Sequence, residues 1–359
     1  MSTNEPIDPS SERGGEGMAP RPTEAEREAA TTLLRMIWGI HISRCVYAVA
    51  ELGIADLLAD GPVSSSELAR ATGSHEPSLY RVLRMLAALR VFEEHDSRTF
   101  GLTSVGDRLR RDAPLSMRSW AIFREALGGV RPFEHIVQTV RTGKPGFDIE
   151  FGQGVFELAA QNPQAAAVRD AAMSERTAAF AASVADSDDF SDVRMLVDVG
   201  GGQGTLLAAI LRRHPHLHGI LFETPLVAAR ASAVLGAIDA DRWEVVAGDF
   251  FAGVPEAADC YVMANVLHDW DDPRAIEILS NCRRSMAPGG RVVIVERLIP
   301  EGGGDPVPTL LSDINMLVIT GGQERTNAEY GRLLEAAGLR LGMVEPVTFP
   351  YGVIHGFAA

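Results

Sequence analysis

The chain is poor in cysteine and lacks any long apolar run. Its 359 residues include only three cysteines, Cys45, Cys260 and Cys282, which lie far apart. They provide neither a disulfide framework nor the paired spacing of a zinc site, so we expect a reducing, cytoplasmic location. No stretch of about 20 apolar residues predicts a membrane-spanning helix, and the polar first residues do not resemble a signal peptide.

The chain is also poor in basic residues. Lysine and arginine number 33 against 48 aspartates and glutamates, which gives a formal net charge of −15. A chain this acidic is repelled by nucleic acid and by anionic membranes, so we expect neither as a partner. Apolar residues make up 46% of the sequence, and the length suits two or three globular domains.

The first half of the chain is predicted to be helical. Residues 1–22 are polar and rich in glycine and proline, which predicts a disordered tail, and Met18 offers a second start. Residues 23–110 read as helices followed by helix, turn, helix and a short hairpin, which is a winged-helix pattern. Such a pattern often binds DNA. The acidic chain, together with Leu79 and Leu83 on the second helix, favours a dimerisation domain instead.

The second half of the chain changes from a helical pattern to an alternation of helices and strands. Residues 111–190 carry no strand signals and are predicted to be a helical connecting region. In residues 191–359 helical stretches alternate with the strand-like runs "MLVDVG", "GILFE", "WEVVAGD", "CYVMANVL" and "RVVIVERLI". This alternation predicts a doubly wound parallel α/β sheet. Two late strands follow, separated by a predicted turn at Pro350–Tyr351–Gly352.

A glycine-rich loop follows the first strand of that sheet. In "LVDVGGGQGT" (196–205), Asp198 precedes Gly200 and Gly202, which let the backbone approach a ligand closely. Such a loop is weak evidence alone, because a plain strand-to-helix turn has the same composition. Glu223 ends the second strand, where an acid can accept both hydroxyls of a ribose.

The third strand adds a matching feature. It ends in Asp249 and Phe250, which suit an adenine through a carboxylate for the amino group and a ring for stacking. All these side chains lie at carboxyl ends of strands, where open α/β sheets bind ligands. The sequence therefore predicts a site for an adenosine-containing molecule.

Six motifs together carry a resemblance to a known family. They are "DVGGGQG", "FETP", "GDFF", "LHDWDD", "APGGRVVIVE" and "GGQERT". From about residue 30 to its end, the chain resembles the S-adenosylmethionine-dependent O-methyltransferases of the caffeate/hydroxyindole type. The resemblance implies a Rossmann-like methyltransferase sheet with a winged-helix-like dimerisation domain, and a homodimer. It also implies S-adenosylmethionine as methyl donor, S-adenosylhomocysteine as product, and a small hydroxylated secondary metabolite, such as a phenolic antibiotic precursor, as acceptor.

His268 is the predicted catalytic residue. It ends the fourth strand in "NVLHDWDD", so it should face the same crevice, while Glu296 ends the next strand and Glu324 lies in "GGQERT". Carboxylates orient a histidine base and stabilise its imidazolium. The resemblance implies that His268 takes a hydroxyl proton, that the two acids bracket it, and that no metal is needed. The alternative is that His268 caps the following helix, whose acidic start is residues 269–272.

An acceptor pocket is predicted beside the histidine. The resemblance places two methionines, Met173 and Met316, against an aromatic ring, although ordinary core packing would also explain them. Trp38 would reach the partner subunit's site if the dimer interlocks as in the family. Plant relatives carry a lysine where this chain has Ala264. The predicted substrate-binding residues are Trp120, Phe123, Met173, Asn265, Asp269 and Met316.

Two other functions stay open at this point. An enzyme of the same fold could methylate carbon with a bound metal, or bind the donor without transferring methyl. The metal version would want a second histidine where this chain has Glu296. A ligand-sensing winged-helix regulator would explain residues 23–110 but not His268 beside two acids.

Overall fold

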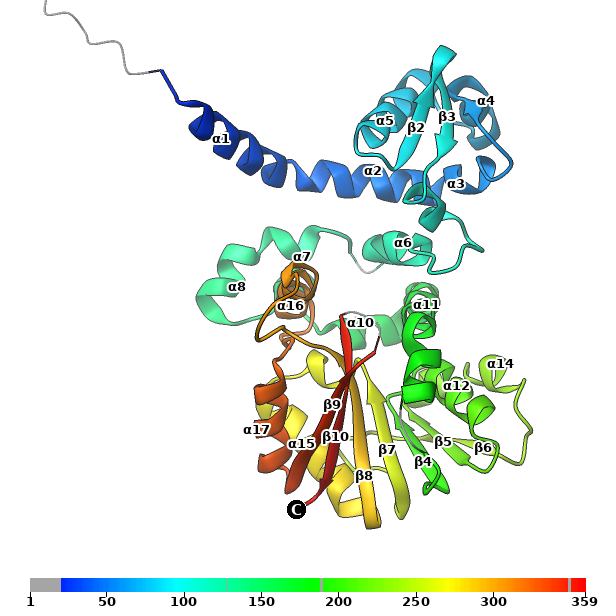
Figure 1. The fold of residues 1–359 in the computed structure, drawn as a ribbon, viewed down its shortest axis with the longest axis vertical. Coiled ribbons are helices and arrows are strands. Elements are labelled where there is room, and N and C mark those ends of the chain that lie inside the picture. Colours follow the sequence, from blue (N-terminus) through cyan, green and yellow to red (C-terminus); the bar gives the residue numbers. More distant parts are fainter. Residues whose placement is uncertain (1–20, 127, 188–189, 348–349) are drawn as a thin grey trace, which may run out of the picture.

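The computed structural model describes residues 21–126, 128–187, 190–347 and 350–359. The predicted disordered tail, residues 1–22, therefore lies outside the described residues except for its last two positions. Figure 1 shows a small N-terminal domain at one end, a sheet-based domain at the other, and a layer of helices between them. The domain limits at residues 110 and 190 stay predictions.

The N-terminal domain has the predicted winged-helix arrangement. Helices α4 and α5 are followed by the β2–β3 hairpin, and β1 pairs antiparallel with β3. Ser64 and Glu67 form a capping box that starts α4, and Gly73 ends it at φ 66°. Its elements are α1 (Glu24–Ile37), α2 (Gly39–Glu51), α3 (Ile54–Leu57), β1 (Val63–Ser64), α4 (Ser65–Thr72), α5 (Glu76–Ala88), β2 (Phe92–His95), β3 (Thr99–Leu102) and the 3₁₀ turns η1 (Asp96–Arg98) and η2 (Gly106–Leu109).

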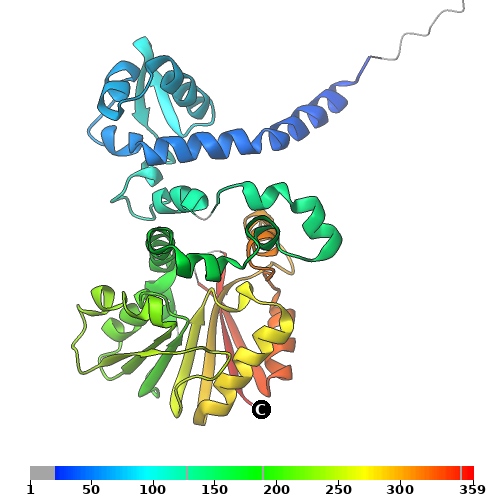
Figure 2. The ribbon, with the colours of Figure 1, turned by 180° about the vertical axis from the view of Figure 1, so that it is seen from behind.

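The connecting layer contains helices joined by short loops, and no strand among its described residues. The long helix α11 packs against α6 on one side and against α12 of the sheet domain on the other, so it joins the two halves of the molecule (Figures 1 and 2). The layer's helices are α6 (Arg118–Ala126), α7 (Arg131–Glu134), α8 (Ile136–Thr142), α9 (Gly146–Phe151), α10 (Val155–Gln161) and α11 (Pro163–Ser187).

The C-terminal domain contains a seven-stranded sheet in the order β6-β5-β4-β7-β8-β10-β9. Pairing is parallel from β6 to β8, whereas β10 runs antiparallel to both β8 and β9. The strand order reverses between β4 and β7, which opens a crevice at their carboxyl ends. The strands are β4 (Met195–Val199), β5 (His218–Glu223), β6 (Trp243–Ala247), β7 (Ala258–Ala264), β8 (Met286–Arg297), β9 (Leu339–Pro346) and β10 (Tyr351–Ala358).

Both faces of this sheet are covered by helices. Alternate residues of one strand enter opposite cores: Val262 packs in one cluster with Phe180 and Leu207, whereas Tyr261 packs in the other with Ile278. The doubly wound α/β fold predicted from the sequence is therefore confirmed. The covering helices of this half are α12 (Thr205–Arg213), α13 (Pro225–Ala228), α14 (Ser232–Leu235), α15 (Asp272–Ser285), α16 (Val307–Ile319) and α17 (Asn327–Ala336).

Three predicted strand limits are wrong. The third strand, β6, ends at Ala247 and not at Asp249 and Phe250. The fourth strand, β7, ends at Ala264 and not at His268, because Asn265 adopts φ 54° and the chain then enters the 3₁₀ turn η3 (Leu267–Asp269). The predicted turn at Pro350–Tyr351–Gly352 is also too long, since Tyr351 pairs with Arg297 at the start of β10.

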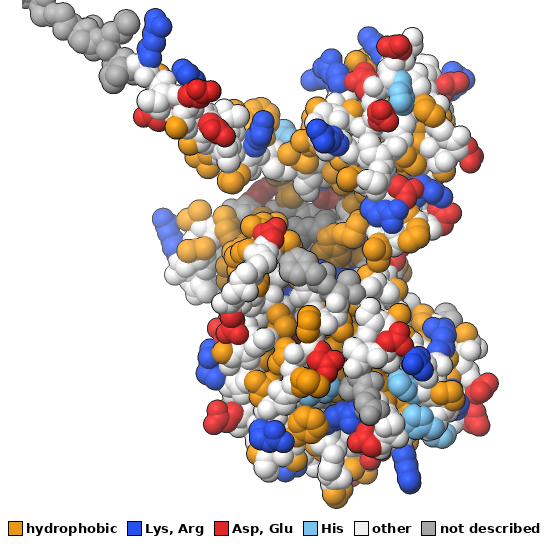
Figure 3. Space-filling view, in the orientation of Figure 1, with side chains coloured by type: hydrophobic (Ala, Val, Ile, Leu, Met, Phe, Trp, Pro, Cys, Tyr) orange, Lys and Arg blue, Asp and Glu red, His pale blue; other side chains and the backbone are white. Residues whose placement is uncertain are grey.

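Helix α1 leaves its apolar residues uncovered. None of its residues is buried, and Leu34 and Ile37 are 51% and 66% exposed. Figure 3 shows hydrophobic side chains along the surface of this helix. Within the described residues no single helix is long and apolar enough to cross a membrane, whereas the bent pair of α1 and α2 reaches that length and composition together. An isolated helix of this size is marginal in water, so something must cover it.

We predict that a second copy of the chain covers α1, which makes the protein a homodimer. The double variant Leu34→Asp/Ile37→Asp should weaken the dimer at least about 100-fold, because burying each side chain is worth roughly 1.5–3 kcal/mol. Sedimentation velocity across micromolar concentrations measures this, with Glu28→Lys on the same helix as control. A wild-type protein that sediments as a monomer would remove the idea.

Candidate active site

Two adjoining cavities occupy the crevice at the carboxyl ends of the parallel strands. The histidine cavity, which contains His268, encloses about 1260 Å³, and the Phe250 cavity encloses about 1370 Å³, counting space open to solvent. They share lining residues on α11 and on the glycine loop, including Arg169, Gly200 and Glu223. Because the crevice is divided into two adjoining hollows with shared walls, it suits two ligands side by side.

The glycine loop between β4 and α12 has the conformation expected of a ligand cradle. Gly200 and Gly202 adopt φ 65° and 60°, which disfavours any other residue, and a Cβ on Gly200 would lie 3.0 Å from Val266. Beneath the loop, both carboxyl oxygens of Asp198 are buried without a hydrogen-bond partner among the described residues. Burial raises the pKa of this carboxyl to about 7. A buried carboxyl group without a partner, next to a loop whose backbone is open to the cavity, suits a positively charged part of a ligand.

The other residues predicted to bind the adenosine-containing ligand line the Phe250 cavity. Glu223, at the end of β5, accepts a hydrogen bond from the Thr224 hydroxyl at 3.1 Å, and burial raises the pKa of its carboxyl. Asp249 is exposed at the cavity edge and accepts from the Phe251 N–H. The Phe250 ring meets the Phe251 ring edge-on at 4.9 Å. The structure therefore gathers an acid, a second acid and an aromatic wall, as the sequence predicted.

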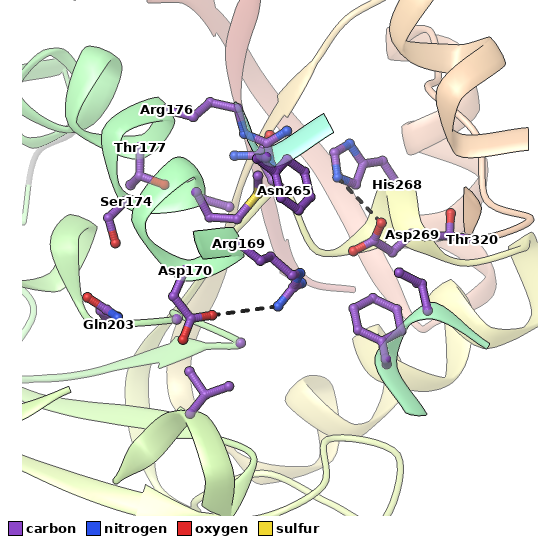
Figure 4. A pocket seen from close by; sticks show the side chains of 18 of the residues that line it. Arg169, Asp170, Ser174, Arg176, Thr177, Gln203, Asn265, His268, Asp269 and Thr320 are labelled. Atoms are coloured by element: carbon purple, nitrogen blue, oxygen red, sulfur yellow. Dashed lines mark ion pairs between the residues drawn. The ribbon is translucent and has the colours of Figure 1, made fainter. Parts of the chain in front are cut away.

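His268 lies on η3 and is only 2% exposed. Its Nδ1 is 3.2 Å from Glu324 Oε1 and 3.4 Å from Glu296 Oε2. The two acids thus meet at one ring nitrogen and do not lie on opposite sides of the ring, which refines the predicted bracketing. Nε2 lies 3.8 Å from Asp269 Oδ1. Figure 4 shows the ring of His268 beside Asp269 at the cavity wall.

The supporting acids are themselves fixed. Glu296 Oε1 accepts backbone N–H groups of Val266 and Leu267, each at 2.9 Å, and Glu324 Oε1 accepts the Ser312 hydroxyl at 2.7 Å. The side chain at the end of β8 therefore satisfies the turn that carries His268. The imidazole of His268 is therefore held by two fixed acids at Nδ1, while its Nε2 side is left for the cavity.

A buried arginine also fixes the η3 turn that carries His268. Arg325, 1% exposed, donates to the carbonyl oxygens of Leu267 and Trp270 at 3.1 and 2.8 Å and to Asp272 at 2.8 Å. The N-cap of α15 is Asp271, whose Oδ1 accepts the Arg274 N–H. The alternative in which His268 caps this helix is therefore wrong.

The electrostatics of the cluster favour a protonated imidazole. Burial alone would lower the pKa of His268, but the carboxylates of Glu296 and Glu324, with a smaller contribution from Asp269, raise it to about 9. Burial raises the pKa of Glu296 and of Asp269. Burial also acts to raise the pKa of Glu324, but the positive charge of His268 outweighs it and lowers this pKa overall. Acids thus outnumber the single cation that they surround.

All six predicted acceptor residues line the histidine cavity. Trp120 and Phe123 come from α6 with ring centroids 5.6 Å apart, while Met173 comes from α11 and Met316 from α16. Asn265 has its strained backbone at the edge of both cavities, and its buried amide atoms have no partner among the described residues. The remaining member of the predicted set is Asp269.

Several lining residues were not predicted. Arg169 and Arg176 lie on the same face of α11 as Met173, at spacings of four and three residues. That spacing is visible in "RDAAMSER", so the helical periodicity around Met173 could have indicated them. The others that the prediction missed include Phe147, Phe156, Ile319 and Thr320.

Comparisons with known proteins agree on one family. The model of the O-methyltransferase domain matches residues 133–340, and that of the O-methyltransferase dimerisation domain matches residues 34–112. The chain is similar to phenazine O-methyltransferase of Lysobacter antibioticus, with 41% identity over 338 residues, which cover 93% of this chain and 98% of that protein. It is 37% identical over 322 residues to mitomycin biosynthesis 6-O-methyltransferase of Streptomyces lavendulae, which cover 89% of this chain and 91% of that protein.

A solved structure extends the comparison to bound ligands. It is an O-methyltransferase from neocarzinostatin biosynthesis in complex with S-adenosylmethionine and 2-hydroxy-5-methyl naphthoic acid. The TM-score is 0.77 at 33% identity, and the match covers 88% of this chain and 96% of that chain. This likeness agrees with a crevice that has room for a donor and an aromatic acceptor together.

We predict that Glu223 binds the ribose hydroxyls of the donor. Glu223→Ala should weaken S-adenosylmethionine binding by about 10- to 100-fold, because hydrogen bonds to a charged acceptor contribute about 1.5–3 kcal/mol. Titration calorimetry measures this, and Glu244→Ala on the neighbouring strand, where the side chain is exposed, serves as control. Unchanged affinity in Glu223→Ala would show that the ribose assignment is wrong.

Proposed function

This chain belongs to the S-adenosylmethionine-dependent O-methyltransferases, and on that premise we propose that it methylates a phenolic hydroxyl with His268 as the general base. S-adenosylmethionine is its methyl donor, and its acceptor is a small secondary metabolite. One observation carries the proposal. The buried His268 is held at Nδ1 by two carboxylates, so that Nε2 is left for the histidine cavity.

The residues of the crevice suit the donor in three places. Glu223 would accept the ribose hydroxyls, Asp249 and Phe250 would take the adenine, and the backbone of Gly200 and Gly202 would pass along the methionine part. Asp198, orphaned below the loop, would receive the amino group. When bound, S-adenosylmethionine supplies a methyl group on a positively charged sulfur, so no further activation of the carbon is needed.

His268 would then remove the acceptor proton at Nε2. A phenol has a pKa of about 10, so transfer to an ordinary imidazole of pKa about 6.5 would cost roughly 5 kcal/mol. With the pKa of His268 raised to about 9, the gap is about one unit, or about 1.4 kcal/mol. The two acids therefore make the ring a stronger base and hold the imidazolium that forms.

The raised pKa of His268 also reduces the fraction of enzyme in which the imidazole is neutral at pH 7. About 1% of free enzyme would carry a neutral His268 at pH 7, because pH 7 lies about two units below that pKa. The base form increases as pH rises toward 9. The positive charge of a bound donor nearby should oppose the imidazolium and lower the pKa of His268 in the complex.

The walls of the histidine cavity support an aromatic acceptor. Two aromatic rings on α6, Trp120 and Phe123, face the same space as the flexible side chains Met173 and Met316. Methionine adapts to flat apolar surfaces and makes favourable contacts with rings. A planar phenolic molecule placed between these walls would bring its hydroxyl to His268, and this positioning alone can contribute about 7–11 kcal/mol.

Two further features of the working protein are part of the proposal. We propose a homodimer, because residues 34–112 match a dimerisation domain and α1 exposes an apolar surface. Trp38, 52% exposed between α1 and α2, would then meet the partner subunit. We also propose a reducing cytoplasm as the protein's location, since no disulfide joins Cys45, Cys260 and Cys282 in the described residues.

One observation favours a second candidate function. The ligand atoms of His268, Glu296 and Glu324 lie within 4.8 Å of one another and could hold a metal ion. A metal-dependent C-methyltransferase would use Nδ1 as a ligand, and Nε2 would then keep its proton. Elemental analysis of the purified protein, together with turnover after chelation, separates this candidate from a metal-free O-methyltransferase.

We predict that His268→Ala keeps its donor affinity and loses about 10²–10⁴-fold in turnover at pH 7. Below about pH 9 both proteins should gain activity in parallel, so the fold loss should stay level there. The loss should shrink only above pH 9, because wild type then levels off while the acceptor still ionises further in the variant. In wild type, kcat/KM should rise with pH toward about 9, where free His268 becomes neutral. The pH–rate profiles of both proteins on one phenolic acceptor measure this, with the exposed His218→Ala as control.

Glu296→Gln is the companion variant for that profile. Removing one negative charge beside Nδ1 should lower the pKa of His268, so the rising limb of kcat/KM should move to lower pH. A His268→Ala enzyme with wild-type turnover at pH 7, or with the same fold loss at every pH, would leave positioning as the only catalytic contribution.

A further inference from the structure

The wall of the histidine cavity includes an arginine that forms no ion pair with the described residues. Arg176, on α11, lines this cavity and not the Phe250 cavity. Its guanidinium carbon lies 5.6 Å from the centre of the Trp120 ring, and its Nε is buried without a hydrogen-bond partner among the described residues. Figure 4 shows Arg176 and His268 at the same cavity, from α11 and from η3.

Arg176 forms no ion pair with the carboxylates of Glu175 and Asp269. Glu175 Oε1 accepts the Ser119 hydroxyl at 2.6 Å, while its Oε2 is buried without a hydrogen-bond partner among the described residues, and Asp269 lies beside His268 Nε2. Burial raises the pKa of Asp269, while the charges of His268, Arg169 and Arg176 act against that rise, so Arg176 is near this acid without an ion pair to it. A buried guanidinium donor without a partner is costly, which points to a partner that arrives with a ligand.

Arg169, two turns earlier on α11, differs in its surroundings. It lines both cavities, its charge acts on Glu223, and its Nη1 lies 3.9 Å from Asp170. It therefore lies at the donor end of the crevice. Arg176 instead stacks on Trp120, a predicted wall of the acceptor pocket, so its free edge faces the space that an acceptor would fill.

We propose that the acceptor carries an anionic group, a carboxylate, in addition to its hydroxyl, and that Arg176 binds this group. The inference rests on the proposed function, since it takes the histidine cavity as the acceptor site. A hydroxylated aromatic carboxylate matches three features at once: the hydroxyl meets His268, the ring lies between Trp120 and Met316, and the carboxylate meets Arg176. The guanidinium fork pairs with both carboxylate oxygens, and apolar walls strengthen that pairing.

The test compares matched pairs of ligands. Hydroxybenzoic and hydroxynaphthoic acids, each beside its own primary carboxamide, are titrated by calorimetry into enzyme saturated with S-adenosylhomocysteine. Wild type should bind at least one acid about 10- to 100-fold more tightly than its carboxamide, and Arg176→Gln should abolish that ratio. Arg176→Lys, which keeps the charge but not the fork, should retain part of it.

Controls separate this inference from a folding defect and from the proposed function. Affinity for S-adenosylhomocysteine should be unchanged in Arg176→Gln, and Arg212→Gln on the exposed face of α12 should keep the wild-type ratio. The inference is wrong if no acid is preferred over its carboxamide, or if the preference survives Arg176→Gln. Because the ratio is measured without methyl transfer, acids that bind through Arg176 but yield no methylated product would contradict the proposed function alone.

Discussion

The contact between His268 Nδ1 and two buried carboxylates is the constraint on which the active site depends. Glu296 and Glu324 are almost fully buried, and a buried charge is costly unless it is paired and hydrogen-bonded. The imidazolium of His268 provides the pairing, and the backbone of the η3 turn provides hydrogen bonds to Glu296. The end of β7, the end of β8 and the segment before α17 are therefore fixed to one another by a single polar cluster.

That cluster determines what faces the crevice. The chain can leave β7 at Ala264 and turn at once because Glu296 accepts the N–H groups that the strand no longer pairs. The turn brings Asn265 and Asp269 to the cavity edge, opposite the glycine loop that follows β4. Since β4 and β7 are neighbours at the point where the strand order reverses, the glycine loop and His268 meet across one crevice.

The sequence predicted the sheet and the crevice at its carboxyl edge, because apolar runs mark strands and ligand residues follow their carboxyl ends. It placed His268 on a strand, however, since a positive φ at Asn265 and hydrogen bonds to an acid 30 residues away leave no local signal. Which nitrogen of His268 the acids would hold is likewise set only by packing. Nothing in the sequence distinguishes Arg176 from other helical arginines, because only the fold places its guanidinium beside the Trp120 ring.

The protonation state of the His268 imidazole is the most direct test of its role as general base. Nitrogen NMR of labelled His268 across a pH titration reports both the pKa and the position of the remaining proton. The account predicts a pKa of about 9 in the free enzyme and, above it, a neutral ring with its proton on Nδ1 beside the two acids. A ring that is neutral at pH 7 with its proton on Nε2 would contradict it, because no nitrogen facing the cavity could then accept a hydroxyl proton.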